Sequence, residues 1–483
     1  MRYTYLKKAV PTIKMMFGMI SGLNKINLDV FINFILFIIT IYFIYTVSAG
    51  IQVANAAAAP FISASSSNRR ILSKISLSQA IKRAVSKQGN ILKAEHIIAE
   101  ETDLKKAAYA GLMPDITIVG GGIWTQMRNG SPLFASANGM REYIGQIRLT
   151  VPIFNPKSYA LISLSRSNLE IAKYRLRLAR LIIAAQVTQD YYGLILLKNE
   201  INIQLKTLSN IKKIFNATEN GYKTGNLPRL DVVQIGFLIT KLQTDLNVLI
   251  SRLKAMEYIF SIEIFCKKFN TDKLSPFLSD AYASNYKLPA LNSLILNAIK
   301  KQPLIKIAKA EIKSADADVS INKAAKLPNI QGGASYGEDT INSVDIPDLG
   351  WQFFVTLNIP ISNFGLHSDY ADAANEKLMA LQSAKSALKL SIKKKLALDY
   401  GFAKAQEKRI SGAKILVKES ESVYKMTEEG YLAGEFNALA LQEAQNNRIK
   451  AQLTLAKAIN RFYLATAQLD IDMGIIPYGG VTL

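Results

Sequence analysis

The sequence contains little of the chemistry that most enzymes and metal proteins need. It has one cysteine, Cys266, and two histidines, His96 and His367, in 483 residues. A disulfide framework, a cysteine–histidine zinc site and an iron–sulfur cluster each require more of these residues. Neither histidine stands in a recognisable nucleophile context, so a hydrolytic triad has no support. The sequence therefore predicts no catalytic residue, no metal site and no cofactor.

Long apolar runs are also scarce, and the one that could cross a membrane as a helix lies near the N-terminus. Basic residues precede the apolar run at residues 30–47, and small residues follow it. This order is typical of an export signal, with cleavage after Ala49 or Ala56. We therefore expect residues 1–56 to be a signal peptide, and an uncleaved membrane anchor is the alternative. If the rest of the chain crosses a membrane, it must do so as closed β-structure.

Acidic residues are few compared with basic ones. The chain has 59 Lys and Arg against 37 Asp and Glu, which gives a net charge of +22. Such a charge indicates nucleic acid or a membrane surface as a partner. The lysines are spread over every expected helix, however, and only Lys393, Lys394 and Lys395 are adjacent. We therefore interpret the charge as solvated helix faces and expect no nucleic-acid partner.

What the chain does contain is a second copy of its own pattern. Ala84 corresponds to Ala298, 214 positions later, and Asp190 corresponds to Asp399, 209 positions later. Copies that keep register through several segments indicate an internal duplication. The predicted domains are a signal peptide at 1–56, a first repeat at 57–265, a linker at 266–290, a second repeat at 291–472 and a C-terminal tail at 473–483.

Each copy is expected to form a helix, two strands, a long helix, a hairpin and a returning helix. The first helix should run over residues 76–111, and second strands are expected at 143–151 and 351–361. Apolar and polar residues alternate in these segments, which is typical of strands with one apolar face. In the later strand the apolar positions are Trp351, Phe353, Val355 and Leu357. Only long polar helices flank the strands, so we predict that this face contacts lipid; a half-buried soluble sheet is the alternative.

Prolines and glycines mark the turns between these elements. Pro152 and Pro360 lie at the ends of the second strands, where the lack of an amide hydrogen permits a turn into a helix. Long helices are expected at 158–220 and 366–429, each followed by a glycine-rich hairpin. The hairpin residues are Gly221, Tyr222 and Gly225 in the first copy, and Gly430, Tyr431 and Gly434 in the second. The returning helices carry apolar residues at heptad spacing, which predicts coiled-coil packing. The predicted fold class is therefore mainly α with a small β part.

This duplicated order resembles the TolC-type outer-membrane efflux and secretion channels, the outer membrane efflux protein family, over residues 75–472. The stretches that carry the resemblance are Met113-Pro114, Leu327-Pro328, the two strand-end prolines, the two hairpins and Leu230-Asp231-Val232. The resemblance implies four transmembrane strands per chain. Three chains would then close a twelve-stranded β-barrel and a twelve-helix coiled-coil tunnel, with the linker and the chain ends around the middle of the tunnel.

The function implied by the resemblance is a passive exit duct in the outer membrane of a Gram-negative bacterium. It would serve a tripartite efflux system or a type I secretion system, without enzyme activity. The implied partners are two further copies of the chain, a periplasmic adaptor (membrane fusion) protein, an inner-membrane transporter driven by protons or by ATP, and outer-membrane lipid. The alternative is a periplasmic coiled-coil adaptor or structural protein that an uncleaved N-terminal helix anchors in the inner membrane.

The resemblance also places a periplasmic gate, and the docking site of the adaptor, at the two hairpins. Asp231 matches an aspartate of the family's first hairpin and Tyr431 a tyrosine of its second, which implies a contact between them. Phe436 stands where the family has a basic partner, and Ala440 where it has an aspartate. The other acidic candidates of the entrance are Glu435 and Glu443. For Asp231 the alternative role is an ordinary acid in the first turn of a helix.

Overall fold

The computed structural model describes residues 75–124, 127–128, 131–132, 141–267, 269–274, 288–340 and 350–477. The predicted signal peptide at 1–56 lies outside the described residues, as does most of the predicted linker. The described chain divides into two compact units. A sheet unit takes residues 112–155 and 328–358, and a helical unit takes the rest.

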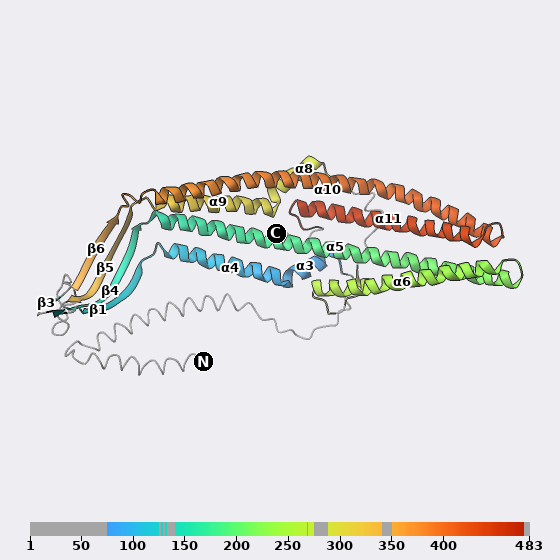
Figure 1. Ribbon diagram of the computed structural model, residues 1–483, viewed down its shortest axis with the longest axis horizontal. Helices are drawn as coiled ribbons and strands as arrows, with labels where there is room; N and C mark the ends of the chain where they lie inside the picture. Colours follow the sequence, from blue (N-terminus) through green and yellow to red (C-terminus); the bar gives the residue numbers. More distant parts are fainter. Residues whose placement is uncertain are drawn as a thin grey trace, which may run out of the picture. The chain divides into compact units, whose positions relative to one another are not determined.

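The sheet unit is built from the predicted strand pairs of both repeats (Figure 1). Its strands are β1 (Asp115–Trp124), β4 (Arg141–Phe154), β5 (Asn329–Thr340) and β6 (Gly350–Asn358). They pair antiparallel in the order β1-β4-β5-β6, so the two repeats join where β4 meets β5. A short separate antiparallel pair is formed by β2 (Met127–Arg128) and β3 (Ser131–Pro132). Strands β1 and β6 are the edges of the four-stranded sheet.

The register of the strands separates apolar from polar residues. One cross-strand row reads Ile116, Leu149, Ala334 and Phe353, and the next reads Ile118, Ile147, Tyr336 and Trp351. The alternate row on the opposite face reads Thr117, Arg148, Ser335 and Gln352. The alternation predicted from the sequence therefore corresponds to two chemically distinct faces.

The strand-end prolines differ in how they meet the sheet. Pro152 lies inside β4, and the pairing of β4 with β5 shifts register between Pro152 and Phe154. A bulge of this kind accommodates a residue that cannot donate to the ladder. Pro360 follows β6, which ends at Asn358 and is thus shorter than predicted. Strand β4 is longer than predicted, because its pairing continues past the proline.

The helices repeat in the same order in both halves of the chain (Figure 1). The first half has α3 (Leu77–Lys87), α4 (Gly89–Ala110), α5 (Pro156–Lys223) and α6 (Arg229–Glu263). The second half has α8 (Leu291–Lys301), α9 (Pro303–Ala324), α10 (Leu366–Leu432) and α11 (Ala438–Asp472). The long helices have 68 and 67 residues, and both returning helices have 35. Among the described residues, no helix combines the length and apolar character required to cross a membrane.

The single first helix predicted at 76–111 is wrong in one respect, because the structure has two helices there. Ser76 caps α3 with a capping box, but Gln88 adopts an extended backbone and α4 begins at Gly89. The second repeat breaks at the corresponding Gln302, which precedes Pro303. Glycine weakens a helix and proline disfavours helical geometry in the residue before it, so both breaks have a local cause.

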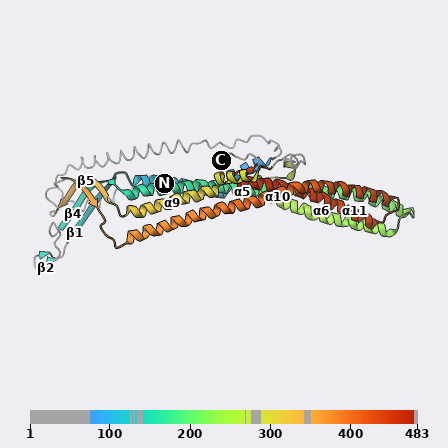
Figure 2. The ribbon, with the colours of Figure 1, turned by 90° about the horizontal axis from the view of Figure 1, so that it is seen from above.

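Each returning helix packs on its long helix as a coil, and the two coils lie side by side (Figure 2). The seam of α6 buries Ile235, Leu242, Leu246 and Phe260 at heptad spacing, as predicted. The seam of α11 is built from smaller residues, including Ala444, Ala451 and Ala458. We call the end of each coil away from its hairpin, where α6 and α11 end, its base. At the base, aromatic rings of α5, α6 and α11 form a shared core. Tyr192 stacks on Tyr463 with 5.6 Å between ring centroids.

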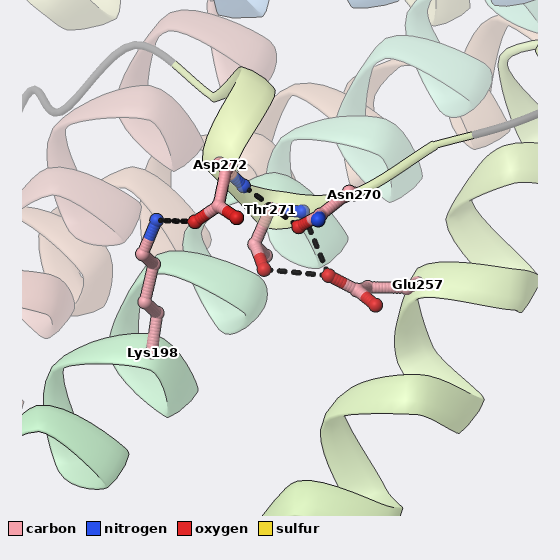
Figure 3. Close-up of polar contacts among 5 residues, drawn as sticks. All are labelled: Lys198, Glu257, Asn270, Thr271 and Asp272. Atoms are coloured by element: carbon pink, nitrogen blue, oxygen red, sulfur yellow. Dashed lines mark hydrogen bonds and ion pairs between the residues drawn. The ribbon is translucent and has the colours of Figure 1, made fainter.

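A short segment after α6 is fastened to both helices of the first coil (Figure 3). It contains the 3-10 turn η1 (Thr271–Lys273). The carboxylate of Glu257 on α6 accepts hydrogen bonds from the backbone amide and the hydroxyl of Thr271, at 2.7 and 2.6 Å. Lys198 on α5 forms an ion pair with Asp272 at 2.7 Å. The start of the predicted linker is therefore bound to the coil.

Candidate functional site

The first hairpin is a glycine-dependent helix end. Gly225 has a φ of +77°, a left-handed conformation that only glycine adopts at low cost. The amide of Asn226 donates to the carbonyl of Gly221 at 2.8 Å, and the amide of Gly225 donates to that of Tyr222 at 3.0 Å. These two bonds define a Schellman motif. A Cβ at Gly221 would lie 2.8 Å from Leu227, which folds back over the helix end.

The second hairpin repeats this geometry with one different residue. Gly434 has a φ of +81°, and the amide of Glu435 donates to the carbonyl of Gly430 at 2.8 Å. Phe436 takes the place of Leu227, and a Cβ at Gly430 would overlap its ring. Phe436, which the resemblance sets in place of a basic partner, therefore packs against the hairpin itself. An aromatic ring in this position cannot supply an ionic link.

The structure brings Asp231 and Tyr431 together across the two hairpins. Asp231 lies in the first turn of α6 and is buried, and its carboxylate accepts hydrogen bonds from the Tyr431 hydroxyl and from the amide of Ala438 at the start of α11. The hydroxyl of Thr218 on α5 lies 2.9 Å from the Tyr431 hydroxyl. Two helices of the first coil are thus linked to both helices of the second.

Burial governs the electrostatics of this contact. Loss of solvent raises the pKa of Asp231, and the hydrogen bonds from Ala438 and Tyr431 oppose the rise. Burial also raises the pKa of Tyr431, with a further contribution from the charge of Asp231. An ordinary first-turn acid would be solvated and would not have partners on another coil. The contact therefore goes beyond the helix-dipole alternative for Asp231.

The other predicted acidic residues do not join this contact. Glu435 lies in the turn, with its side chain near Gly430, and Glu443 is exposed on α11. Their assignment to the entrance stays a prediction.

Sequence reasoning missed another polar contact, which joins α10 to α11 farther from the hairpins. Arg448 occupies a heptad position of α11 that the pattern assigns to the seam. Its guanidinium lies 4.3 Å from the centroid of the Tyr424 ring and forms an ion pair with Glu421 at 2.7 Å. Burial is the main cause that raises the pKa of Tyr424. A charged residue in an otherwise apolar heptad was the available signal, because a buried cation requires partners.

A second candidate surface is the apolar face of the sheet unit. Trp351, Phe353, Val355 and Leu357 are between 56% and 77% exposed, although they are large apolar side chains. The ring centroids of Trp351 and Phe353 lie 6.2 Å apart in a stacked arrangement, and Tyr336 adjoins Trp351 at 4.8 Å. Contiguous exposed apolar side chains of this kind mark a contact with lipid or protein.

Phe354 interrupts the alternation of this strand, and the structure explains why. It belongs to the opposite face and is half-buried. A Cβ at Gly333 would overlap its ring, so the glycine leaves the space that the ring fills. The exception in the sequence pattern is therefore packing within the sheet.

Comparison with known proteins identifies the family. A model of the family described as outer membrane efflux protein matches residues 80–235 and 294–474, more than half of the chain. The chain belongs to the outer membrane efflux protein family. Members of this family are channels rather than enzymes, and its relatives are outer-membrane proteins of Gram-negative bacteria, which confirms the predicted location.

One curated relative is the pyoverdine export outer membrane protein OpmQ of Pseudomonas putida. The two sequences are 22% identical over 309 residues, which cover 62% of this chain and 64% of the relative. The match thus spans just under two thirds of that protein.

Solved structures of the family share the fold. The outer membrane protein VceC of Vibrio cholerae has a TM-score of 0.69 at 15% identity, covering 82% of this chain and 96% of that one. The outer-membrane channel MtrE of Neisseria gonorrhoeae, in its open state, has a TM-score of 0.65 at 17% identity, covering 83% and 89%. At these identities the likeness establishes the fold alone, and it confirms the predicted fold class.

Proposed function

We propose that three copies of this protein form the exit duct of a tripartite efflux or type I secretion system. The sheet units together make a β-barrel through the outer membrane, and the helical units together make a periplasmic tunnel. The duct is passive, because energy comes from an inner-membrane transporter that is coupled to it through a periplasmic adaptor. The observation that carries the proposal is the exposed apolar face of the sheet unit.

The sheet of one chain is incomplete as a membrane-spanning structure. Its edges β1 and β6 have no neighbouring strand in the described chain, and unpaired backbone groups are not tolerated in lipid. Pairing β6 of one copy with β1 of the next would satisfy both edges. It would also continue the apolar rows around the outside and the row with Thr117, Arg148 and Gln352 around the inside.

The helical unit also has two sides that no other helix of the described chain covers. Helix α6 packs on α5, α5 on α11 and α11 on α10, which leaves α6 and α10 at the two sides. Both carry large apolar residues that remain exposed in one chain. On α6 they include Leu230, Val233, Phe237, Val248 and Ile262, and on α10 they include Leu398, Phe402, Leu416, Val423 and Met426. Their spacing of three and four residues, or sums of these, is that of a second coiled-coil seam, which a neighbouring copy would cover.

The contact of Asp231 with Tyr431 gives the entrance a closed state. It ties the two hairpins of one chain, so an opening motion that separates the coils must break it. The hairpin turns around Gly221, Gly225, Gly430 and Gly434 are the surface offered to the adaptor. Tyr222, which is 44% exposed, belongs to the same surface.

Substitutions on the two faces of β6 test the barrel. Phe353→Arg would place a cation toward the bilayer at a cost of about 2–4 kcal/mol per chain. We expect it to abolish the SDS-resistant oligomer in outer-membrane fractions and the ion conductance in planar bilayers.

The matched control is Thr356→Arg, three positions along the same strand and on the opposite face. It should assemble and conduct, because its side chain points into the lumen. Equal tolerance of both substitutions would refute the barrel. Fractionation of the unmodified protein with the inner membrane would favour the anchored adaptor instead.

A further inference from the structure

The base of each coil contains a pair of carboxyl groups in contact. In the first repeat, Glu263 is the last residue of α6, and its side chain is hydrogen-bonded to that of Asp190 on α5. In the second repeat, Asp472 is the last residue of α11, and its side chain is hydrogen-bonded to that of Asp399 on α10. Asp399 follows Asp190, and Asp472 follows Glu263, by the same 209 positions. The same pair therefore occurs twice at equivalent positions.

A contact between two carboxyl groups requires a proton. An ionised carboxylate only accepts hydrogen bonds, so two of them can be joined only if one is protonated. The Oε2 atom of Glu263 and the Oδ2 atoms of Asp399 and Asp472 are buried, and no other donor of the described chain reaches them. A negative charge is also unfavourable at the last residue of a helix, where the helix dipole is negative. All three conditions favour one proton in each pair.

The two pairs differ in the side chain one helical turn earlier on the long helix. In the second repeat Lys395 forms an ion pair with Asp472, and Gln468 donates to the same carboxylate at 2.8 Å. In the first repeat the corresponding residue is Gln186, which donates to Asp190 at 2.7 Å. Glutamine satisfies one oxygen atom but adds no positive charge. The first pair therefore lacks the cation that offsets a second negative charge.

The charged groups on the surrounding elements do not change this difference. Around the first pair, Lys198 is bound to Asp272 and Glu257 to Thr271 (Figure 3), and the charge that acts on the pKa of Glu263 is that of Asp190. Elements packed on α5 also carry Lys82, Arg83 and Lys87 of α3 and Lys457 and Arg461 of α11, and Lys457 forms an ion pair with Glu200 at 3.5 Å.

Around the second pair, burial, followed by the hydrogen bond and charge of Asp472, raises the pKa of Asp399 to about 6, and the charge of Lys395 opposes the rise. Helix α8 adds Lys300 and Lys301, and α11 adds Asp470, whose pKa burial raises to about 6. Both signs of charge are thus represented at this base, with the lysine in direct contact with the pair.

We propose that the two carboxyl pairs are proton-dependent contacts between the long and returning helices, and that the pair of the first repeat is the one that responds most strongly around neutral pH. Loss of its shared proton leaves two adjacent negative charges that repel, which loosens the end of α6 from α5. In the second repeat Lys395 offsets part of the added charge, so that pair releases its proton at lower pH and is disturbed less around neutral pH.

The direction of the pH effect follows from linkage. Burial, followed by the neighbouring Asp190, raises the pKa of Glu263 from an ordinary 4.5 to about 7. Between these pH values the folded protein holds a proton that the unfolded protein has released, so stability at this site falls as the pH rises. The base of the first coil is therefore tightest at acidic pH and loosest above neutral pH.

Hydrogen exchange on the detergent-solubilised full-length protein between pH 5.5 and 8.5 tests this, with times scaled for the intrinsic pH dependence of exchange. We expect protection at the end of α6, residues 255–263, to fall by roughly tenfold per unit of pKa difference that the pH change spans. Protection at the end of α11, residues 464–472, should change much less. The readout needs no channel activity, so its outcome is independent of the proposed export function.

Exchanging the distinguishing residues provides matched variants. Gln186→Lys, at an exposed position, should reduce the fall in the first coil, and Lys395→Gln should enlarge the smaller fall in the second. Glu263→Gln, which keeps a hydrogen-bond donor without a titrating group, should make α6 insensitive to pH. A fall that persists in Glu263→Gln, or a response unchanged by Gln186→Lys, would overturn the proposal.

Discussion

The two hairpins of the chain have the same backbone and different contacts. Both use a Gly-Tyr-x-x-Gly sequence, a left-handed glycine and a residue folded back over the helix end. Yet Tyr431 is fully buried against Asp231, whereas the equivalent Tyr222 is 44% exposed. The position equivalent to Asp231 in the second repeat is Ala440. A duplicated motif therefore fixes the turn, and an acid on the returning helix of the other coil decides whether the tyrosine is held.

The largest effect should come from the shared backbone. Gly225→Ala and Gly434→Ala each place a Cβ at a positive φ, which costs about 1–2 kcal/mol per chain. No atom lies within 4 Å of either Cβ position, so strain is the sole cost and should be equal at the two sites. Thermal unfolding of the oligomer, followed by circular dichroism, measures both. Clearly unequal losses of thermal stability would show that the two hairpins do not share one backbone conformation.

A smaller effect should come from removing the contact that only the tyrosine of the second hairpin makes. The contact of Asp231 with Tyr431 is worth about 0.5–1.5 kcal/mol per chain. The double variant Asp231→Ala with Tyr431→Phe should raise single-channel conductance in planar bilayers, because the closed entrance loses its tie, while trimer stability stays nearly unchanged. Tyr222→Phe is the matched control and should leave conductance unaltered. If the double variant lowers stability with no change in conductance, Asp231 serves the helix and not the gate.

The smallest effect should come from giving Tyr222 of the first hairpin the acidic partner that Tyr431 has in the second. In the proposed ring, the second hairpin of one copy adjoins the first hairpin of the next, so Ala440→Asp would offer Tyr222 an acceptor from a neighbouring chain. A gain of about 0.5–1 kcal/mol per chain should lower conductance slightly. Adding Tyr222→Phe to the same chain should cancel the change. Lowered conductance that survives the second substitution would point to the added charge and not to the hydrogen bond.

Much of the fold could be predicted because each element has a local signal. Alternation defined the strands, heptads defined the returning helices, and Gly225 and Gly434 defined the turns. The break at Gln88 was missed because an extended residue before Gly89 leaves no gap in an amphipathic pattern. The length of β4 was missed because proline was expected to end the strand, whereas a register shift after Pro152 allows pairing to continue.

The site was less predictable, because its contacts join residues far apart in the sequence. The resemblance paired Asp231 with Tyr431, but nothing local predicts Thr218 or the burial that surrounds them. The packing of Phe436 on Gly430 depends on how the turn folds back, whereas the sequence shows only that Phe436 is not a basic residue. The carboxyl pairs were invisible for the same reason, since Asp190 and Glu263 look like ordinary surface acids until α6 folds back on α5.

The equal lengths of the coils have a consequence for symmetry. Because the long helices have 68 and 67 residues and both returning helices have 35, the two tips of a chain extend equally far from their bases. At about 1.5 Å per residue, a difference of one residue displaces a tip by less than the width of an atom. Three copies would present six loops at one level, so a partner with sixfold symmetry would meet an almost matching rim on a threefold molecule. The departures from that match are the residues that differ between the hairpins, Leu227 and Phe436 foremost.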